Sequence, residues 1–309
     1  MKRPALAGRA VAHFRRAIEL DPKHADASSS YYQAGKWLHE AGRAEEAEEL
    51  YAAGVDAGIW TSVLQRPGYL AAGVKYQAPW PTPSLCKRAI EVLEGAAAGI
   101  SAELRSALAE ASGGFGVDNE NLTDSGAWSQ RIYRRNGLPL FESEGGVGSK
   151  GFERQFPKTV AAIAQLGHRS TDRLPKGSVE FSLLAPGTHI KRHCGPTNHK
   201  WRLHLALMAP PAEEKLARLR VGEETRSWVV GKVLLFDDSF EHEVWYDADS
   251  DRGEGEARAV LIVDLWHPEI ADESSREQVR WDFGFQHAAE SLRRTGAPGG
   301  AAGNPGLQL

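Results

Sequence analysis

After Gly177 the spacing of the apolar residues changes from a helical period of about 3.6 to an alternation at every second position. Short segments with this alternation follow one another, and turns rich in Gly, Pro, Asn and Asp separate them. Because no helical pattern interrupts the series, we predict an all-β sandwich or jelly roll and not a parallel α/β sheet. The predicted strands are residues 179–184, 189–193, 200–208, 226–230, 232–236, 242–246 and 258–266.

The composition limits the class of protein. A chain of 309 residues, 41% of them apolar, is long enough for one catalytic domain and a helical piece. A net charge of −4 without a concentrated basic face argues against a nucleic-acid binder. The two cysteines, Cys86 and Cys194, build neither a disulfide framework nor a zinc finger, which indicates a reducing compartment. No apolar run approaches the ~18 residues of a membrane helix, and residues 1–10 lack a signal-peptide core, so we expect a cytoplasmic protein.

The N-terminal region contains a short repeat. Gly8-Arg9-Ala10 recurs as Gly42-Arg43-Ala44, 34 residues later, and each copy opens an Ala-rich helical pattern. This period is typical of a tetratricopeptide helix pair, and the match covers residues 5–58. An arbitrary amphipathic helical hairpin remains the alternative. Because such a repeat buries its apolar face only against a neighbour, we expect it to dock on the following domain.

The middle of the chain combines a connector with helices. Residues 59–83 are rich in Pro and aromatic residues, which indicates an extended segment held against a surface. A short strand is expected from Trp128 to about Tyr133. Helical spacing predicts further helices over residues 85–108, interrupted at Gly95 and Gly99, over residues 156–166, and over residues 281–294.

These patterns divide the chain into four parts. We expect a helical segment at 1–58, a connector with packing helices at 59–115, a jelly-roll domain at 116–270 and a C-terminal part at 271–309. The acidic stretch 247–256 is interpreted as a solvated hairpin tip, because its spacing does not fit a calcium loop. The Gly-rich tail from Thr295 is expected to be disordered.

Polar side chains recur on the predicted strands. Five of the eleven histidines lie between His189 and His242. In strand 200–208 the side chains of Lys200, Arg202 and His204 share one face, opposite an apolar face. A second cation, Arg258, begins the mainly apolar face of strand 258–266. A wet strand face explains one such pattern, but two together predict a pocket for an anion, most simply a dicarboxylate held by arginine forks.

His193 and His242 are candidate metal ligands. Imidazole suits divalent first-row metals, and a His-x-Asp/Glu pair with a distal His forms the facial triad of non-haem Fe(II) oxygenases. Here the residue two after His193 is Gly195, so the carboxylate is missing. From the residues alone, two ordinary strand histidines remain an equal alternative. A zinc hydrolase ranks last, because no general base stands at a recognisable spacing such as H-E-x-x-H.

Three motifs carry a resemblance to a known family: H-C-G-P-T-N-H-K-W-R-L-H-L, F-D-D-S-F-E-H-E-V-W and R-A-V-L-I-V-D-L-W-H-P-E. Over residues 128–270 the sequence resembles the aspartyl/asparaginyl β-hydroxylases, which are Fe(II)- and 2-oxoglutarate-dependent oxygenases. The resemblance implies an α+β chain whose core is a double-stranded β-helix (jelly-roll or cupin-like fold). Animal members also carry a tetratricopeptide region ahead of the catalytic domain, in agreement with residues 5–58.

The resemblance also implies roles for individual residues. The family binds iron through two histidines with a glycine at the third place, which resolves the missing carboxylate. By this resemblance the catalytic centre comprises His193 and His242 as iron ligands, Ser182, Arg202 and His204 at the 2-oxoglutarate, and Arg258 at its distal carboxylate. Asp237 and Asp238 are interpreted as turn residues that support the site, with the alternative that one replaces the missing ligand.

Three departures from the animal enzymes concern the cosubstrate pocket, at Arg134, and the substrate. Arg134 stands where those enzymes have a tryptophan, and Lys200 stands where they have an arginine that helps to hold the substrate carboxylate. The loop between Trp245 and Arg258 is also longer. We expect hydroxylation, with O2, of the β-carbon of an aspartyl or asparaginyl residue in a peptide or protein. The same chemistry on a free or carrier-bound amino acid, another small molecule or a lipid acyl chain is an alternative, as is a non-catalytic helical-repeat scaffold.

Overall fold

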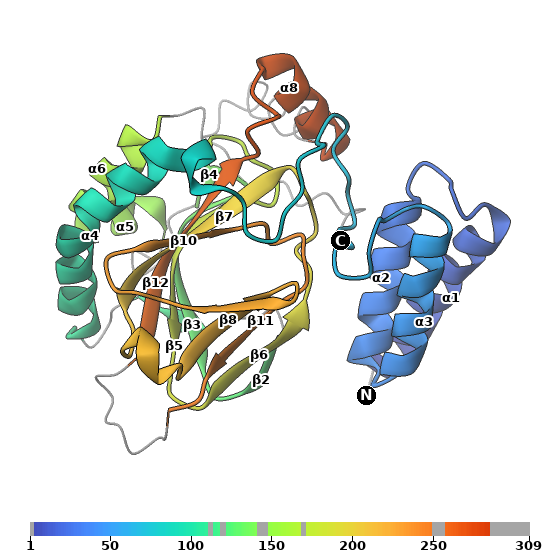
Figure 1. Ribbon diagram of the computed structural model, residues 1–309, viewed down its shortest axis with the longest axis horizontal. Coiled ribbons are helices and arrows are strands. Elements are labelled where there is room, and N and C mark those ends of the chain that lie inside the picture. Colours follow the sequence, from blue (N-terminus) through green and yellow to red (C-terminus); the bar gives the residue numbers. More distant parts are fainter. Residues whose placement is uncertain are drawn as a thin grey trace.

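The computed structural model describes residues 3–110, 114–117, 122–140, 148–167, 171–248 and 257–284. Two antiparallel sheets pack face to face at the centre of the molecule, and helices lie on two sides of them (Figure 1). The chain therefore has the predicted α+β class, with an N-terminal helical segment followed by a β domain.

The larger sheet has the strand order β1-β3-β5-β12-β7-β10, with β4 beside β3, and the smaller sheet has the order β2-β6-β11-β8-β9. From β5 to β12 the chain crosses from one sheet to the other at each turn, except in the β8–β9 hairpin. This is the double-stranded β-helix, as predicted. The larger sheet comprises β1 (Gly116–Val117), β3 (Trp128–Arg135), β4 (Leu138–Pro139), β5 (Ser178–Leu184), β7 (Lys200–Met208), β10 (Val233–Phe236) and β12 (Arg258–Trp266). The smaller sheet comprises β2 (Thr123–Ser125), β6 (Thr188–His193), β8 (Ala217–Val221), β9 (Glu224–Ser227) and β11 (His242–Tyr246).

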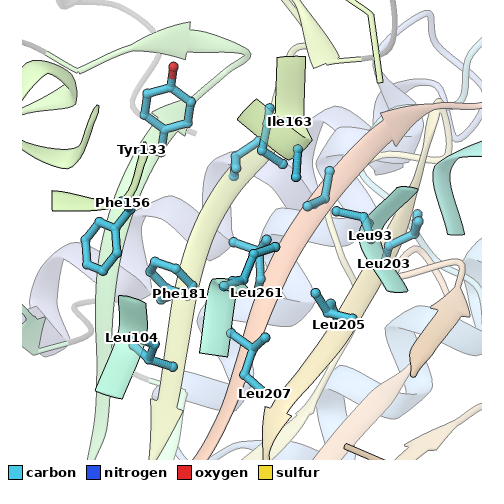
Figure 2. Packing of buried hydrophobic residues seen from close by; sticks show 14 of the residues in the cluster. Leu93, Leu104, Tyr133, Phe156, Ile163, Phe181, Leu203, Leu205, Leu207 and Leu261 are labelled. Atoms are coloured by element: carbon cyan, nitrogen blue, oxygen red, sulfur yellow. The ribbon is translucent and has the colours of Figure 1, made fainter. Parts of the chain in front are cut away.

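Both faces of the larger sheet are buried. Its outer face packs against α4 (Lys87–Leu108), α5 (Ser149–Gln155) and α6 (Pro157–Gln165), as Figure 2 shows for Leu203, Leu205 and Leu207. Its inner face packs against the smaller sheet through a second cluster that includes Val260 and Ile262. The alternation in β7 and β12 therefore separates a face covered by helices from a face directed into the double sheet. The polar face of β7 is thus the inner one.

Two local predictions were wrong. The predicted strand 226–230 is replaced by the β8–β9 hairpin, and Val229 and Val230 after it are exposed. Helix α4 continues through Gly95 and Gly99, because burial of one face against the sheet stabilises it across both glycines. The last described helix is α8 (Glu273–Asp282), and residues 285–294 of the predicted helix 281–294 lie outside the described residues. Its N-cap Asp272 accepts a hydrogen bond from the Ser275 N–H, which fixes the earlier start. The stretch 249–256 and the tail from residue 285 lie outside the described residues.

The N-terminal segment consists of α1 (Arg3–Leu20), α2 (Ala27–Glu40) and α3 (Ala44–Asp56). Helices α2 and α3 approach closely at Gly35, where an added Cβ atom would lie 2.1 Å from the ring of Tyr51. Trp60, Tyr31 and Leu38 belong to the same buried cluster. The helical nature of this segment is confirmed, whereas its tetratricopeptide identity stays a prediction. Among the described helices, none is long and apolar enough to cross a membrane.

The connector between α3 and α4 lies against the β domain, as predicted. The N–H of Tyr69 donates to the carbonyl oxygen of Pro196 at 3.0 Å, and that of Asp237 donates to the carbonyl oxygen of Pro79 at 3.1 Å. The connector ends in a 3-10 turn, Pro83–Cys86, and a second such turn, Ala212–Glu214, precedes β8. The predicted boundaries 1–58, 59–115, 116–270 and 271–309 remain a proposal for the division into domains.

Candidate active site

The two candidate iron ligands face each other across a strand pair. His193 ends β6 and His242 begins β11, and the two are direct partners in this antiparallel pair. Their ring centroids lie 4.1 Å apart. The Nδ1 atom of His193 contacts the carbonyl oxygen of Lys191 at 2.7 Å, and that of His242 contacts the carbonyl oxygen of Phe240 at 2.9 Å. Because a carbonyl oxygen only accepts, each Nδ1 carries the proton, and each Nε2 has the lone pair that binds a metal.

A third protein ligand is absent from the described residues, in which no three His, Cys, Asp or Glu side chains gather as a metal site. Gly195 stands at the third place, and its N–H donates to the carbonyl oxygen of Asp238 at 2.6 Å. The carboxylate nearest this position is therefore that of Asp238, which follows a different strand. Burial lowers the pKa of His242 well below its usual value, and the charge of His193 adds to this effect. A neutral imidazole is the form that binds a metal.

Asp238 is held in a buried network of charges. Its Oδ2 accepts a hydrogen bond from Nζ of Lys200 at 2.5 Å, and Nη2 of Arg202 lies 3.5 Å away. Arg202 donates to both carboxylate oxygens of Asp264, from Nε at 2.7 Å and from Nη2 at 2.8 Å. Lys200 also lies 3.4 Å from Asp264. Burial alone would raise the pKa of Asp238, but Lys200 and Arg202 outweigh burial and hold it below the usual value.

A second group of polar side chains lies on the inner face of three neighbouring strands. Arg258 on β12 is fully buried, and among the described residues its Nε and Nη1 atoms have no hydrogen-bond partner. Its guanidinium lies 4.7 Å from the ring centre of Trp228. Burial lowers the pKa of Arg258 to about 9, with Tyr246 opposing the shift. A buried cation of this kind needs an anionic partner, and a carboxylate group of a bound dicarboxylate would fit beside Arg258.

His204 and Ser182 flank Arg258 on β7 and β5. Both ring nitrogens of His204 are buried and unpaired within the described ranges, and its ring stacks on Trp228 with centroids 6.1 Å apart. Burial, followed by Arg258 and Arg202, lowers the pKa of His204 well below its usual value. The Oγ atom of Ser182 accepts a hydrogen bond from Nε1 of Trp128 at 3.0 Å. The donors required by a keto diacid are therefore present.

The predicted residues form two neighbouring sets. Arg202 and Lys200 join the network of Asp238 and Asp264 beside the histidines, whereas Ser182, His204 and Arg258 belong to the inner faces of β5, β7 and β12. The role of each residue toward cosubstrate or substrate stays a prediction. Arg134 stacks beside Tyr133, with its Cζ atom 5.3 Å from that ring, and does not line the cavity described below.

Sequence reasoning missed the aromatic support of this site. Trp228 follows β9 outside the three motifs, and an isolated residue after a strand leaves no periodic signal. The hydrogen bond from Trp128 to Ser182 was equally unforeseen, although Gln130 and Ser182 are register partners in the β3–β5 pair. The alternation along β12 places Asp264 on the face of Arg258 and could have indicated a partner for Arg202.

A cavity of about 1040 Å³ opens between the helical segment and the β domain. One wall is formed by α2, including Tyr32, Gln33 and Trp37. The opposite wall includes His193 and His242. The proposed metal site therefore faces the helical segment across a shared space.

Residues 94–268, more than half of the chain, match the family model described as aspartyl/asparaginyl beta-hydroxylase. The chain belongs to this family. The aspartyl/asparaginyl beta-hydroxylases of Mus musculus and Homo sapiens are each 34% identical to it over 268 residues. This alignment covers 86% of the present chain and 33% and 32% of the two relatives, so the chain spans about a third of their length. Aspartate beta-hydroxylase domain-containing protein 1 of Mus musculus is 43% identical over 109 residues, 35% of this chain and 28% of that relative.

Among solved structures, a 2OG-Fe(II) oxygenase family oxidoreductase from Burkholderia pseudomallei is 10% identical, with a TM-score of 0.36. That similarity covers 63% of this β-hydroxylase-family chain and 95% of the other.

Proposed function

We propose that this β-hydroxylase-family protein is an Fe(II)- and 2-oxoglutarate-dependent dioxygenase that hydroxylates the β-carbon of an aspartyl or asparaginyl residue in a peptide or protein. The observation that carries the proposal is Arg258, a buried guanidinium without a counter-ion among the described residues, on the inner face of the domain that also holds two facing histidines. A site with two facing imidazoles that also needs an organic anion has the two components of such a reaction.

In this proposal His193 and His242 hold the iron, and Arg258 holds the distal carboxylate of 2-oxoglutarate. Ser182, His204 and Arg202 would orient the remainder of the cosubstrate. When bound, iron and 2-oxoglutarate supply the oxidation by O2 that yields succinate, CO2 and a hydroxylated carbon. The protein contributes binding, orientation and a dry environment: the two sheets exclude water from Arg258, and Trp228 packs against its guanidinium.

The shape of the cavity favours an extended substrate. At about 1040 Å³ it lies just above the range of about 300–1,000 Å³ for small-molecule pockets, and its walls come from both the helical segment and the β domain. A peptide lying between Trp37 on α2 and the histidines on β6 and β11 would use both walls. The alternative is the same reaction on a free or carrier-bound amino acid, which would leave the α2 wall uncovered. We also propose a cytoplasmic location, in keeping with the unpaired Cys86 and Cys194.

The test is succinate release from 2-oxoglutarate, measured with Fe(II) against peptides that contain Asp or Asn, free amino acids and acyl substrates. Peptide-dependent succinate with a matching 16 Da mass increase on the Asp or Asn residue supports the proposal. A His193→Ala, His242→Ala double variant should lose iron binding in a titration of the apo-protein. Wild-type iron affinity in that variant, or no turnover of 2-oxoglutarate with any substrate or without one, contradicts the proposal and favours a scaffold.

A further inference from the structure

Residues 64–66 of the connector lie against residues 239–241, which immediately precede His242. The N–H of Glu241 donates to the carbonyl oxygen of Leu64 at 2.7 Å. Nε2 of Gln65 donates to Oγ of Ser239 at 2.9 Å, and both side chains are buried. Nη2 of Arg66 donates to Oε2 of Glu241 at 2.7 Å, in a pair whose side chains are only 5% and 7% exposed. We call these three contacts the clasp.

The clasp surrounds the carbonyl group that orients His242. Phe240 forms an isolated antiparallel bridge with Gln65, and its carbonyl oxygen accepts the hydrogen bond from Nδ1 of His242 at 2.9 Å. The residues on either side of Phe240 are the two that the clasp holds by their side chains, Ser239 and Glu241. The direction of this carbonyl sets both the tautomer of His242 and the direction of its Nε2 lone pair.

Arg66 links the clasp to the helical segment. Its guanidinium lies 4.4 Å from the ring centre of Tyr51 on α3, and burial of both groups makes this contact independent of solvent. Glu241 has a second cationic partner, Arg220, at 2.9 Å, and Arg220 also reaches Glu243 at 2.9 Å. The residues before and after His242 are therefore both fixed by ion pairs, and Arg66 extends this network to α3 through its contact with Tyr51.

The first candidate ligand is also held from the helical side. Nη2 of Arg192 lies 3.1 Å from Oε1 of Glu48 on α3. The hydroxyl of Tyr32 on α2 donates to the carbonyl oxygen of Cys194 at 3.4 Å. These contacts flank His193, but one is exposed and the other is long. The buried clasp at His242 therefore carries more of the support than the contacts at His193.

We infer that Arg66 and Gln65 are positioning residues for His242, the distal iron ligand. The connector, docked on the β domain, thereby helps to form the metal site. This inference rests on the proposed assignment of His193 and His242 as iron ligands. Groups that orient a metal-binding histidine typically change metal affinity by about 10–100-fold when they are removed. A clasp that only joined two domains would change stability and leave the metal affinity as it is.

The test is a titration of the full-length apo-protein with Co(II), whose visible absorption reports the geometry of its ligands. Arg66→Met should weaken Co(II) binding about tenfold and alter the absorption spectrum of the bound ion. Gln65→Ala removes one contact of the clasp and should weaken binding by a smaller factor. Arg66→Lys keeps a cation beside Glu241 and should recover part of the affinity. Arg15→Met is the matched control, because it removes a more exposed pair with Glu46 elsewhere in the helical segment.

Wild-type affinity and spectrum in a folded Arg66→Met variant would overturn the inference. If Arg66→Met does not fold, Gln65→Ala decides: weakened binding at unchanged melting temperature supports the inference, and unchanged binding rejects it. A loss of affinity in Arg15→Met equal to that in Arg66→Met also rejects it, because the effect would then come from the helical segment in general. Failure of the wild-type protein to bind Co(II) or Fe(II) would instead remove the iron assignment itself.

Discussion

Gly195 and Asp238 are packed so closely that a Cβ atom on Gly195 would lie 2.8 Å from Cγ, from Oδ2 and from the carbonyl oxygen of Asp238. Packing therefore requires a glycine at the position that the proposed iron site leaves without a side-chain ligand. The space that a ligand side chain would need is occupied by a carboxylate, and Lys200 already compensates its charge.

Gly195→Asp should therefore not create a facial triad. The new side chain meets a backbone carbonyl as well as the carboxylate of Asp238, so the chain must shift, and two carboxylates must share one buried place. We expect a loss of stability of about 2 kcal/mol or more and weaker metal binding, measured by urea unfolding and by titration of the apo-protein.

The matched control for this variant is Gly95→Ala in α4. An added Cβ atom there has no neighbour within 4 Å among the described residues, and alanine favours the helix. This variant should be as stable as the wild type or more so, by up to about 1 kcal/mol. Tighter iron binding by Gly195→Asp at wild-type stability would show that the packing of Asp238 does not close the third position.

Arg258→Met should separate binding of the cosubstrate from stability. In the described part of the chain, two nitrogens of this buried cation have no hydrogen-bond partner, and an apolar side chain removes that cost. We expect an unchanged or raised melting temperature without ligand, together with a rise of about 100-fold in the KM for 2-oxoglutarate, because the bidentate anion contact is lost. Arg218→Met, which removes a more exposed pair with Asp247, serves as the control and should leave this KM unchanged.

Lys200→Met tests whether this residue serves the substrate or the fold. Lys200 is fully buried and lies between Asp238 and Asp264, so its removal leaves the 3.5 Å contact with Arg202 as the remaining ion pair of Asp238 within the described ranges. Breaking a buried pair of this kind costs about 3–5 kcal/mol, which urea unfolding would measure. Lys232→Met, at an exposed pair with Glu94, should change stability by less than about 1 kcal/mol. Wild-type stability of Lys200→Met with a raised KM for a peptide substrate would return Lys200 to the predicted substrate role.

How far the sequence predicts this molecule depends on whether a feature is periodic. Strands β7, β11 and β12 were predicted to the residue, because an alternating or continuous apolar run ends at turn residues in each case. The hairpin β8–β9 was not predicted, because arginines and a glutamate separate its few apolar residues. The two histidines were found through their motifs. Trp228 and the clasp residue Arg66 were not, because both lie outside strands and act through contacts with residues distant in the chain.

The environment of Asp237 leads us to expect an unusual dependence of the free energy of unfolding on pH. Its Oδ1 accepts a hydrogen bond from the N–H of Ser239 at 2.9 Å, but its Oδ2 is buried without a partner in the described part of the chain. Burial, opposed by Ser239 and supported by the adjacent Asp238, raises the pKa of Asp237 from 3.8 to about 7. The folded protein therefore holds this proton more tightly than the unfolded chain does.

The direction in which stability changes with pH follows from that difference in proton binding. Between pH 3.8 and about pH 7 the unfolded chain releases the proton while the folded protein retains it, so a rising pH favours unfolding through this group until about pH 7. Asn at position 237 keeps an acceptor for the Ser239 N–H and cannot ionise. Asp237→Asn should therefore stabilise the protein by roughly 2–3 kcal/mol more at pH 8 than at pH 5, or by about 3–5 °C in Tm. Buried histidines such as His199, whose pKa burial lowers to about 3, destabilise both proteins equally in acid, so the difference between the two melting curves isolates Asp237. Curves of Tm against pH that run parallel for variant and wild type would show that Asp237 is ionised in the folded protein throughout this range.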